Sequence, residues 1–169
     1  MIFKTNRLII RPLKITDLPG FYDMQGNPKV MKYVFGKNQT EEEAREDLER
    51  CINLYKKEGN DFWIWAIELQ SSGEFVGTAA LIKSDKGEDE IGYRFCEKHW
   101  GNGFGTETMS GMIDYCFNQL KFKELYAVAE KENIGSVKIL ERSMIFQREF
   151  YNEEEKCTDR EYRLKNPNN

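Results

Sequence analysis

Runs of apolar, β-branched and aromatic residues alternate with polar turns and predict most of the strands. Three runs follow one another closely, at 62–69, 75–82 and 90–96. Ser71-Ser72-Gly73 between the first two is typical of a short hairpin loop, and a charged turn at 83–89 precedes the third. These runs predict a β-meander in the middle of the chain. Further strands are predicted at 7–11, 125–129, 145–150 and 160–164.

Apolar residues spaced three and four apart predict the helices. The strongest helix is 106–120, where six apolar side chains share one face: Met109, Met112, Ile113, Cys116, Phe117 and Leu120. A second helix is predicted to follow Thr40, which forms a capping box with Glu43, and to continue until Gly59. Two shorter helices are predicted at 16–24, capped by Thr16-Asp17, and at 136–142.

The predicted elements follow the order βααβββαβαββ. This order predicts an α/β (α+β) fold, in which helices cover one sheet. A chain of 169 residues corresponds to about one domain, and it contains no internal repeat, low-complexity tract or flexible linker. We therefore expect a single domain over residues 1–169, with residues 166–169 frayed.

Composition narrows the classes of partner. Twenty-five Lys and Arg residues against 29 Asp and Glu give a net charge of −4, whereas a duplex-binding protein usually presents a strongly basic surface. We therefore expect no nucleic acid as the main ligand. The chain has no run of about 18 apolar residues and no apolar segment typical of a signal peptide, so we expect no membrane association.

The positions of the cysteines and the histidine limit the redox and metal chemistry that this chain can carry out. The four cysteines lie far apart without a C-x-x-C motif, which favours reduced thiols and a cytoplasmic location over a disulfide framework. His99 is the single histidine, which excludes a multi-histidine metal site, and we expect no bound metal.

The segment 100–107 (WGNGFGTE) lies between a predicted strand and the strongest helix. Its three glycines, Gly101, Gly103 and Gly105, permit backbone conformations and close approaches that other residues resist. The N–H groups of a first helical turn, aided by the helix dipole, bind anions. The segment therefore predicts a site for a phosphate or diphosphate group.

Two common nucleotide motifs do not match this segment. A Walker A loop requires Gly-Lys before Ser or Thr, but Thr106 follows Gly105. A dinucleotide fingerprint requires glycine at the sixth position, but threonine stands there whether the count starts at Gly101 or Gly103. The preceding β-meander also differs from a βαβ unit. A glycine-rich turn that binds nothing remains the alternative.

The same segment resembles the pyrophosphate loop of the GNAT (GCN5-related) N-acetyltransferases, whose pattern is [Q/R]-x-x-G-x-[G/A]. Trp100 in the first position resembles the W-G-x-G-[YF]-[AG]-T-E form of the ribosomal-protein alanine acetyltransferases of RimJ and RimL type. Further matches extend over nearly the whole chain, namely 5–12 (TNRLIIRP) with Asp17, 73–77 (GEFVG), 90–93 (EIGY) and 133–142 (NIGSVKILER).

This resemblance implies a fold and an activity. The fold would be a mixed, splayed, mostly antiparallel sheet of six to seven strands flanked by helices. The strand ending at Cys96 would part there from the strand 125–129. The donor would be acetyl-CoA, and the acceptor a primary amine: a protein N-terminus, a polyamine, an aminoglycoside or another small amine. Direct attack in a ternary complex is implied, and a homodimer is possible because relatives are often dimers.

The resemblance also implies the residues that bind coenzyme A. The pantetheine arm would lie against backbone near Phe95 and Cys96, and the pyrophosphate against amides of the glycine segment. Asn133 and the helix beginning at Ser136 would line the other side of the arm. The implied cofactor-binding residues are Phe95, Cys96, Trp100, Gly101, Asn102, Gly103, Phe104, Gly105, Thr106, Asn133 and Ser136.

Glu90 and Ser136 are the candidate catalytic residues. Glu90 is the first residue of the predicted strand beside the implied thioester and could act as general base. The alternative is a carboxylate at the strand edge that pairs with Arg94 or a lysine. Leu140 stands where many relatives carry a tyrosine acid, so Ser136 becomes the candidate acid, with helix capping as its alternative. The turn at 143–146, which lacks the glycine usual in relatives, and the missing tyrosine keep a non-catalytic acyl-CoA-binding module open as a rival. A second rival is a phosphate- or nucleotide-binding protein that uses the glycine segment without CoA.

Overall fold

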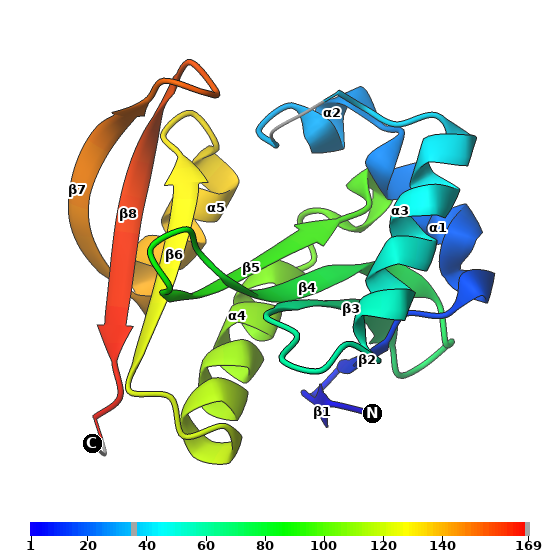
Figure 1. Ribbon diagram of the computed structural model, residues 1–169, viewed down its shortest axis with the longest axis horizontal. Coiled ribbons are helices and arrows are strands. Elements are labelled where there is room, and N and C mark those ends of the chain that lie inside the picture. The colour runs from blue at the N-terminus through cyan, green and yellow to red at the C-terminus, as the bar shows by residue number, and fades with distance from the viewer. Residues whose placement is uncertain (35–36, 168–169) are drawn as a thin grey trace.

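Eight strands form one mixed sheet in the order β1-β2-β3-β4-β5-β6-β8-β7 in a computed structural model that describes residues 1–34 and 37–167 (Figure 1). The strands are β1 (Phe3–Lys4), β2 (Leu8–Pro12), β3 (Phe62–Leu69), β4 (Phe75–Lys83), β5 (Asp89–Phe95), β6 (Glu124–Glu130), β7 (Ile145–Asn152) and β8 (Cys157–Lys165). The predicted α/β class and mostly antiparallel sheet are confirmed. The predicted count of six to seven strands is too low, because β1 has only two residues and no pattern marks it.

Helices cover both faces of this sheet. They are α1 (Leu18–Gln25), α2 (Pro28–Met31), α3 (Glu41–Leu54), α4 (Phe104–Asp114), extended by a π-helical turn (Tyr115–Gln119), and α5 (Ile134–Ser143). α1 and α3 bury one apolar cluster against the sheet, and α4 and α5 bury a second against the other face. Both faces of β3 are therefore buried, with Ala66 in the first cluster and its neighbours Trp65 and Ile67 in the second. No helix in the described ranges is both long and apolar enough to cross a bilayer.

The sheet opens between β5 and β6, the one parallel pair among the strands of residues 1–34 and 37–167. These strands are paired at Glu90 and Tyr126 and then diverge (Figure 1). The Cys96 N–H donates to the Val76 carbonyl at 3.0 Å, on the side of β4. Because successive residues of an antiparallel strand direct their main-chain groups to opposite sides, those of Tyr93 and Phe95 face the opening. The splay implied by the resemblance is thus present.

The capping box at Thr40 is confirmed and begins α3. The Thr40 hydroxyl accepts a hydrogen bond from the Glu43 N–H at 3.3 Å, and the Glu43 carboxylate accepts one from the Thr40 N–H at 2.7 Å. These bonds satisfy donors that the first helical turn leaves free, and the bond from the Thr40 N–H to the carboxylate lowers the pKa of Glu43.

We expect Thr40→Ala to destabilise the protein by about 1 kcal/mol, the usual cost of removing a capping oxygen. Thr40→Ser keeps that oxygen and is the matched control. Urea unfolding of the two variants beside the wild type measures the difference. A Thr40→Ala midpoint equal to that of Thr40→Ser would show that the cap does not stabilise α3.

Three expectations about local structure are wrong. Asp17 does not cap α1 through its side chain, because its carboxylate accepts from the Lys14 N–H and from Arg11. The predicted order has two helices between the strands 7–11 and 62–69, whereas the described residues there form three α-helices; the additional one is α2, which begins at Pro28 and is capped by Asn27. Asn166 is not frayed: it is buried, and its N–H donates to the Lys123 carbonyl at 2.8 Å. Residues 168–169 lie outside the described part of the chain.

Candidate functional site

The turn from β5 into α4 depends on two glycines. Gly101 and Gly103 both have φ of +77°, a left-handed conformation that side chains with a Cβ rarely adopt. Gly103 is the N-cap of α4, and the next residue, Phe104, buries its ring in the core. Glycine is therefore required here by the backbone, and the turn exposes the start of α4.

The first turn of α4 has free hydrogen-bond donors. The first helical bond runs from the Glu107 N–H to the Gly103 carbonyl at 3.1 Å. In the part of the chain that the structure describes, nothing accepts from the N–H groups of Phe104, Gly105 and Thr106. Three free donors at the positive end of an 11-residue helix are suited to hold an anion.

Side chains of the turn stabilise it by hydrogen bonds to its own main chain. The Trp100 indole N–H donates to the Phe95 carbonyl at 3.0 Å, while the ring itself is 48% exposed. The Asn102 amide donates to the carbonyls of His99 and Trp100 at 3.0 and 3.2 Å. Trp100 and Asn102 thus fix the turn that presents the free donors.

Arg7 and Glu107 belong to this site, although the sequence indicated no role for them. The Arg7 Nε lies 2.7 Å from Glu107 Oε2, and Arg7 Nη1 donates to the Asn102 carbonyl at 2.9 Å. The Arg7 guanidinium covers the Phe104 ring at 4.6 Å and is 45% exposed. Although Arg7 is paired with Glu107, its Nη2 group makes no hydrogen bond to a described residue and remains available beside the glycine turn. Its only sequence signal was its place in the 5–12 segment.

The starts of α4 and α5 meet beside β5. A Cβ on Gly105 would lie 2.8 Å from Ile139 Cδ1, so glycine allows the two helices to pack this closely. Asn133 caps α5 by accepting from the Ser136 N–H at 3.3 Å, so α5 begins before Ser136 and the predicted helix start is wrong. The Tyr93 hydroxyl is buried near Ser136 without a hydrogen-bond partner among the described residues, and burial raises its pKa.

Cys96 lies deeper than Phe95. Its thiol points to helix α1, 3.6 Å from the Gly20 carbonyl, and burial raises its pKa to about 12. Its N–H is used within the sheet, as described above. Of the two residues predicted to contact the pantetheine arm, Phe95 thus offers main-chain groups at the opening, and Cys96 is enclosed.

Glu90 stands where β5 and β6 part. Burial raises its pKa to about 7, and the negative charges of Glu88, Asp159 and Asp85 add to the shift. No hydrogen bond or ion pair joins its carboxylate to another described residue. The alternative of an ion pair with Arg94 is therefore not observed, since Arg94 donates to Gln25. A partly buried carboxyl that titrates near neutrality can exchange protons there.

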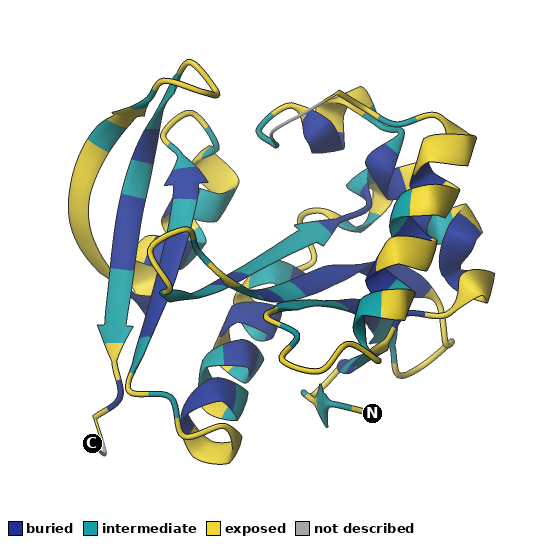
Figure 2. Ribbon diagram, in the orientation of Figure 1, coloured by how far each residue is buried: buried dark blue, intermediate teal, exposed yellow. Residues whose placement is uncertain are grey.

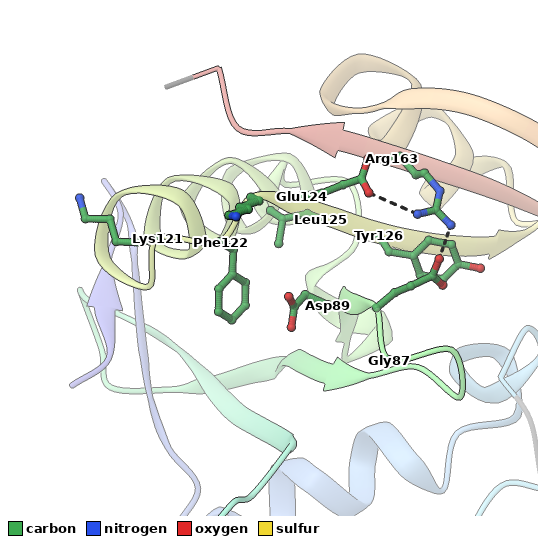
Figure 3. A pocket seen from close by; sticks show the side chains of 10 residues that line it. Gly87, Asp89, Lys121, Phe122, Glu124, Leu125, Tyr126 and Arg163 are labelled. Atoms are coloured by element: carbon green, nitrogen blue, oxygen red, sulfur yellow. Dashed lines mark hydrogen bonds and ion pairs between the residues drawn. The ribbon is translucent and has the colours of Figure 1, made fainter. Parts of the chain in front are cut away.

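Two pockets flank the parted strands. One of about 460 Å³ lies where β5 and β6 begin, between the β4–β5 turn and residues 121–126 (Figure 3). The Arg163 side chain lines this pocket and forms ion pairs with Glu88 and Glu124. A second, of about 230 Å³, is lined by the end of α2, the end of β6 and the β7–β8 hairpin: Lys32, Tyr33, Val34, Glu130, Glu154, Glu155 and Cys157. Neither is lined by the glycine turn.

Comparison with known proteins decides the family. The sequence matches the acetyltransferase (GNAT) domain over residues 7–143. The N-acetyltransferase p20 of Bacillus licheniformis, which is described as uncharacterised, is 33% identical over 149 residues; the match covers 86% of this chain and 82% of p20. The chain belongs to the GNAT family. This GNAT protein is an N-acetyltransferase, as the resemblance implied.

Solved GNAT structures share its fold. An acetyltransferase of the GNAT family from Bacillus anthracis superposes with a TM-score of 0.84 at 22% identity, covering 96% of this chain and 97% of the other. RimL, a ribosomal L7/L12 alpha-N-protein acetyltransferase in complex with coenzyme A, has a TM-score of 0.80 at 14% identity and 97% coverage of both chains. At these identities the likeness establishes the fold of this GNAT protein.

Proposed function

We propose that this protein moves the acetyl group of acetyl-CoA to a primary amine by direct attack in a ternary complex, with Glu90 as general base. One observation carries the proposal: an unpaired carboxyl with a pKa near 7 stands at the opening of the sheet. The second requirement is that the protein bind the anionic acetyl-CoA. The free N–H groups at the start of α4 are suited to bind its phosphates.

The residues present fit coenzyme A. The free N–H groups of Phe104, Gly105 and Thr106, with Arg7 beside them, suit its diphosphate, and Trp100, Gly101, Asn102 and Gly103 shape the turn that exposes those donors. The open edge of β5 at Phe95 would receive the pantetheine amides, with Cys96 behind it and Asn133 and Ser136 on the far side. When bound, acetyl-CoA supplies an acetyl thioester that a free amine can attack.

Glu90 would prepare the amine. Alkylammonium groups have pKa values of about 8–10, so the acceptor must lose a proton before it attacks. A carboxylate with a pKa near 7 can take that proton, directly or through a water, at neutral pH. Main-chain N–H groups at the open edge of β5 would stabilise the negative charge that develops on the carbonyl oxygen.

Ser136 is the proposed proton donor to the departing thiol. The Ser136 hydroxyl does not cap helix α5, because the Asn133 side chain is the N-cap. The buried hydroxyl of Tyr93 lies beside it, and a hydrogen bond between them would orient Ser136.

The cysteines favour direct attack over an acetyl-cysteine intermediate. A nucleophilic cysteine needs a lowered pKa, but burial raises the pKa of Cys51 and Cys157 to about 11 and that of Cys96 and Cys116 to about 12. Each thiol is therefore protonated at neutral pH. A protein N-terminal amine, the acceptor that RimL's description gives for RimL, or a small amine would then attack the thioester itself.

Two measurements test the proposal. Acetyl-CoA and CoA should raise the unfolding midpoint, whereas ATP and NAD should not, because selective binding to the native state stabilises it. An assay of released thiol over a panel of amines then separates the enzyme from a binding module. Stabilisation by acetyl-CoA without any amine-dependent thiol release would favour the module, and stabilisation by ATP alone would favour a nucleotide-binding protein.

A further inference from the structure

We propose that the acceptor carries a carboxylate as well as its amine, and that it lies over Gly92, with the amine at Glu90 and the carboxylate at Arg94. This inference rests on the proposed function and names the class of its acceptor. It depends on two independent features of β5: open space above a glycine inside the strand, and a half-buried arginine without a carboxylate partner.

Glu90, Gly92 and Arg94 share one face of β5. Residues two apart in a strand point to the same side, and the Cα atoms of Glu90 and Arg94 are about 13 Å apart at the usual rise. This face turns toward α1, since Arg94 donates to Gln25 and the next residue on the same side, Cys96, points to Gly20. Most of β5 is intermediate in burial (Figure 2), so the face is partly accessible.

The space above Gly92 is open. A Cβ at Gly92 would meet no atom within 4 Å, whereas a Cβ at Gly77 on the neighbouring strand would meet the Arg94 carbonyl at 2.2 Å. Ala80, directly opposite Gly92 on β4, is also small. Glycine inside a strand costs stability, and it often marks a place where a ligand approaches the backbone. Packing accounts for the glycine at 77 but not for the one at 92.

Arg94 holds a charge that the described residues do not neutralise by direct contact. Its guanidinium makes one hydrogen bond, to the neutral Gln25 side chain, and burial lowers its pKa. The Gln25 amide donates in turn to the carboxylate of Asp47, which already forms an ion pair with Arg50 at 2.6 Å.

Arg11, by contrast, is paired with both Asp17 and Glu68, at 2.8 and 2.5 Å. Withdrawing a guanidinium even partly from water without a carboxylate partner is costly, and the unused N–H groups of Arg94 suit a ligand carboxylate bound through two hydrogen bonds.

The two ends of this face have opposite charge. Asp85, Asp159 and Glu88 lie near Glu90 and leave this end negative overall even though Glu88 pairs with Arg163, and a negative end attracts the ammonium form of an acceptor. Arg94 provides the positive end, which attracts a carboxylate and repels a second ammonium. A short peptide or amino acid matches this polarity, whereas a polyamine matches only the Glu90 end.

The test compares acceptors that differ only in the carboxylate. Diglycine and triglycine are offered with a free or an amidated C-terminus, and kcat/KM is measured from thiol release with acetyl-CoA. We expect the wild type to prefer the free form by about tenfold or more, the value of one good charge-assisted contact. In Arg94→Gln this preference should disappear, because kcat/KM for the free peptides should fall to the value for the amidated peptides. Arg94→Lys should restore part of the preference.

A second variant tests the open space. Gly92→Ala adds one methyl where the free protein has room, so its unfolding midpoint should equal or exceed that of the wild type, and its affinity for CoA should not change. We expect KM for the preferred peptide to rise about tenfold, because the methyl occupies the acceptor's space. An unchanged KM would show that no acceptor lies over Gly92.

The outcomes separate this inference from the proposed function. If the wild type acetylates free and amidated peptides equally, or uses spermidine better than either, the inference is overturned and the acetyltransferase activity stands. If no amine releases thiol, and calorimetry with CoA present finds no peptide binding that depends on Arg94, both are overturned.

Discussion

Glu90→Gln should lower kcat by about 100-fold or more at neutral pH, the range that general-base catalysis usually contributes. Glutamine keeps the shape of the side chain but cannot accept the proton of the acceptor amine. Binding of CoA should be unchanged, because the free donors that suit its diphosphate lie at the start of α4. Steady-state kinetics with a saturating amine, together with calorimetry of CoA binding, measure the two effects.

The pH dependence gives a second test of Glu90. Because the base must be ionised, kcat of the wild type should rise with pH through about 7, the pKa of this carboxyl, and level off above it. Glu90→Gln should lose this rise. A mutant profile that keeps the same rise would assign it to another group, and an undiminished kcat would exclude Glu90 as the base.

The raised pKa also predicts a change in stability. The folded state binds the Glu90 proton more tightly than the unfolded state, so the contribution of this group is favourable at low pH and is lost as pH rises through about 7. Glu90→Gln should therefore raise the unfolding midpoint at about pH 8 but not at about pH 4. Glu46→Gln, at an exposed position of α3, is the matched control and should change neither kcat nor the midpoint.

Gly103→Val should weaken CoA binding by at least about tenfold. A β-branched residue is strained at a φ of +77°, so the turn must rearrange to accept it, and the N–H groups of the first α4 turn lose their common direction. Calorimetric titration with CoA measures the loss.

A matched glycine separates binding from strain. Gly59 has φ of +68°, and a Cβ there would meet nothing within 4 Å, so Gly59→Val imposes similar backbone strain away from the glycine turn. Both variants should lose stability, by about 1–3 kcal/mol, but Gly59→Val should bind CoA as the wild type does. Equal CoA affinity in Gly103→Val and Gly59→Val would refute the role of the turn.

The sequence predicted those elements whose signals are local. The capping box at Thr40 located the start of α3, and the run 62–69 corresponds to β3 with the same bounds. Strand β1 was missed because two residues show no alternation. The helix at 106–120 is α-helical only to Asp114 and continues as a π-helical turn, a change that apolar spacing does not reveal.

Features that depend on tertiary contacts could not be predicted. The sequence left open whether Glu90 pairs with Arg94, and only the position of Gln25 on α1 shows that it does not. Arg7 reaches the glycine turn from almost 100 residues away in the chain, so no spacing rule links the two. The parting of β5 from β6 entered only through family resemblance, since neither strand's sequence signals it.

The central claim is that main-chain donors at the start of α4 hold the diphosphate of coenzyme A. Titration of the ¹⁵N-labelled protein with CoA, followed by amide NMR, tests it most directly. The amide protons of Phe104, Gly105 and Thr106 should move downfield and show the largest shifts in the spectrum. Saturation with CoA that leaves these three resonances in place while others move would contradict it.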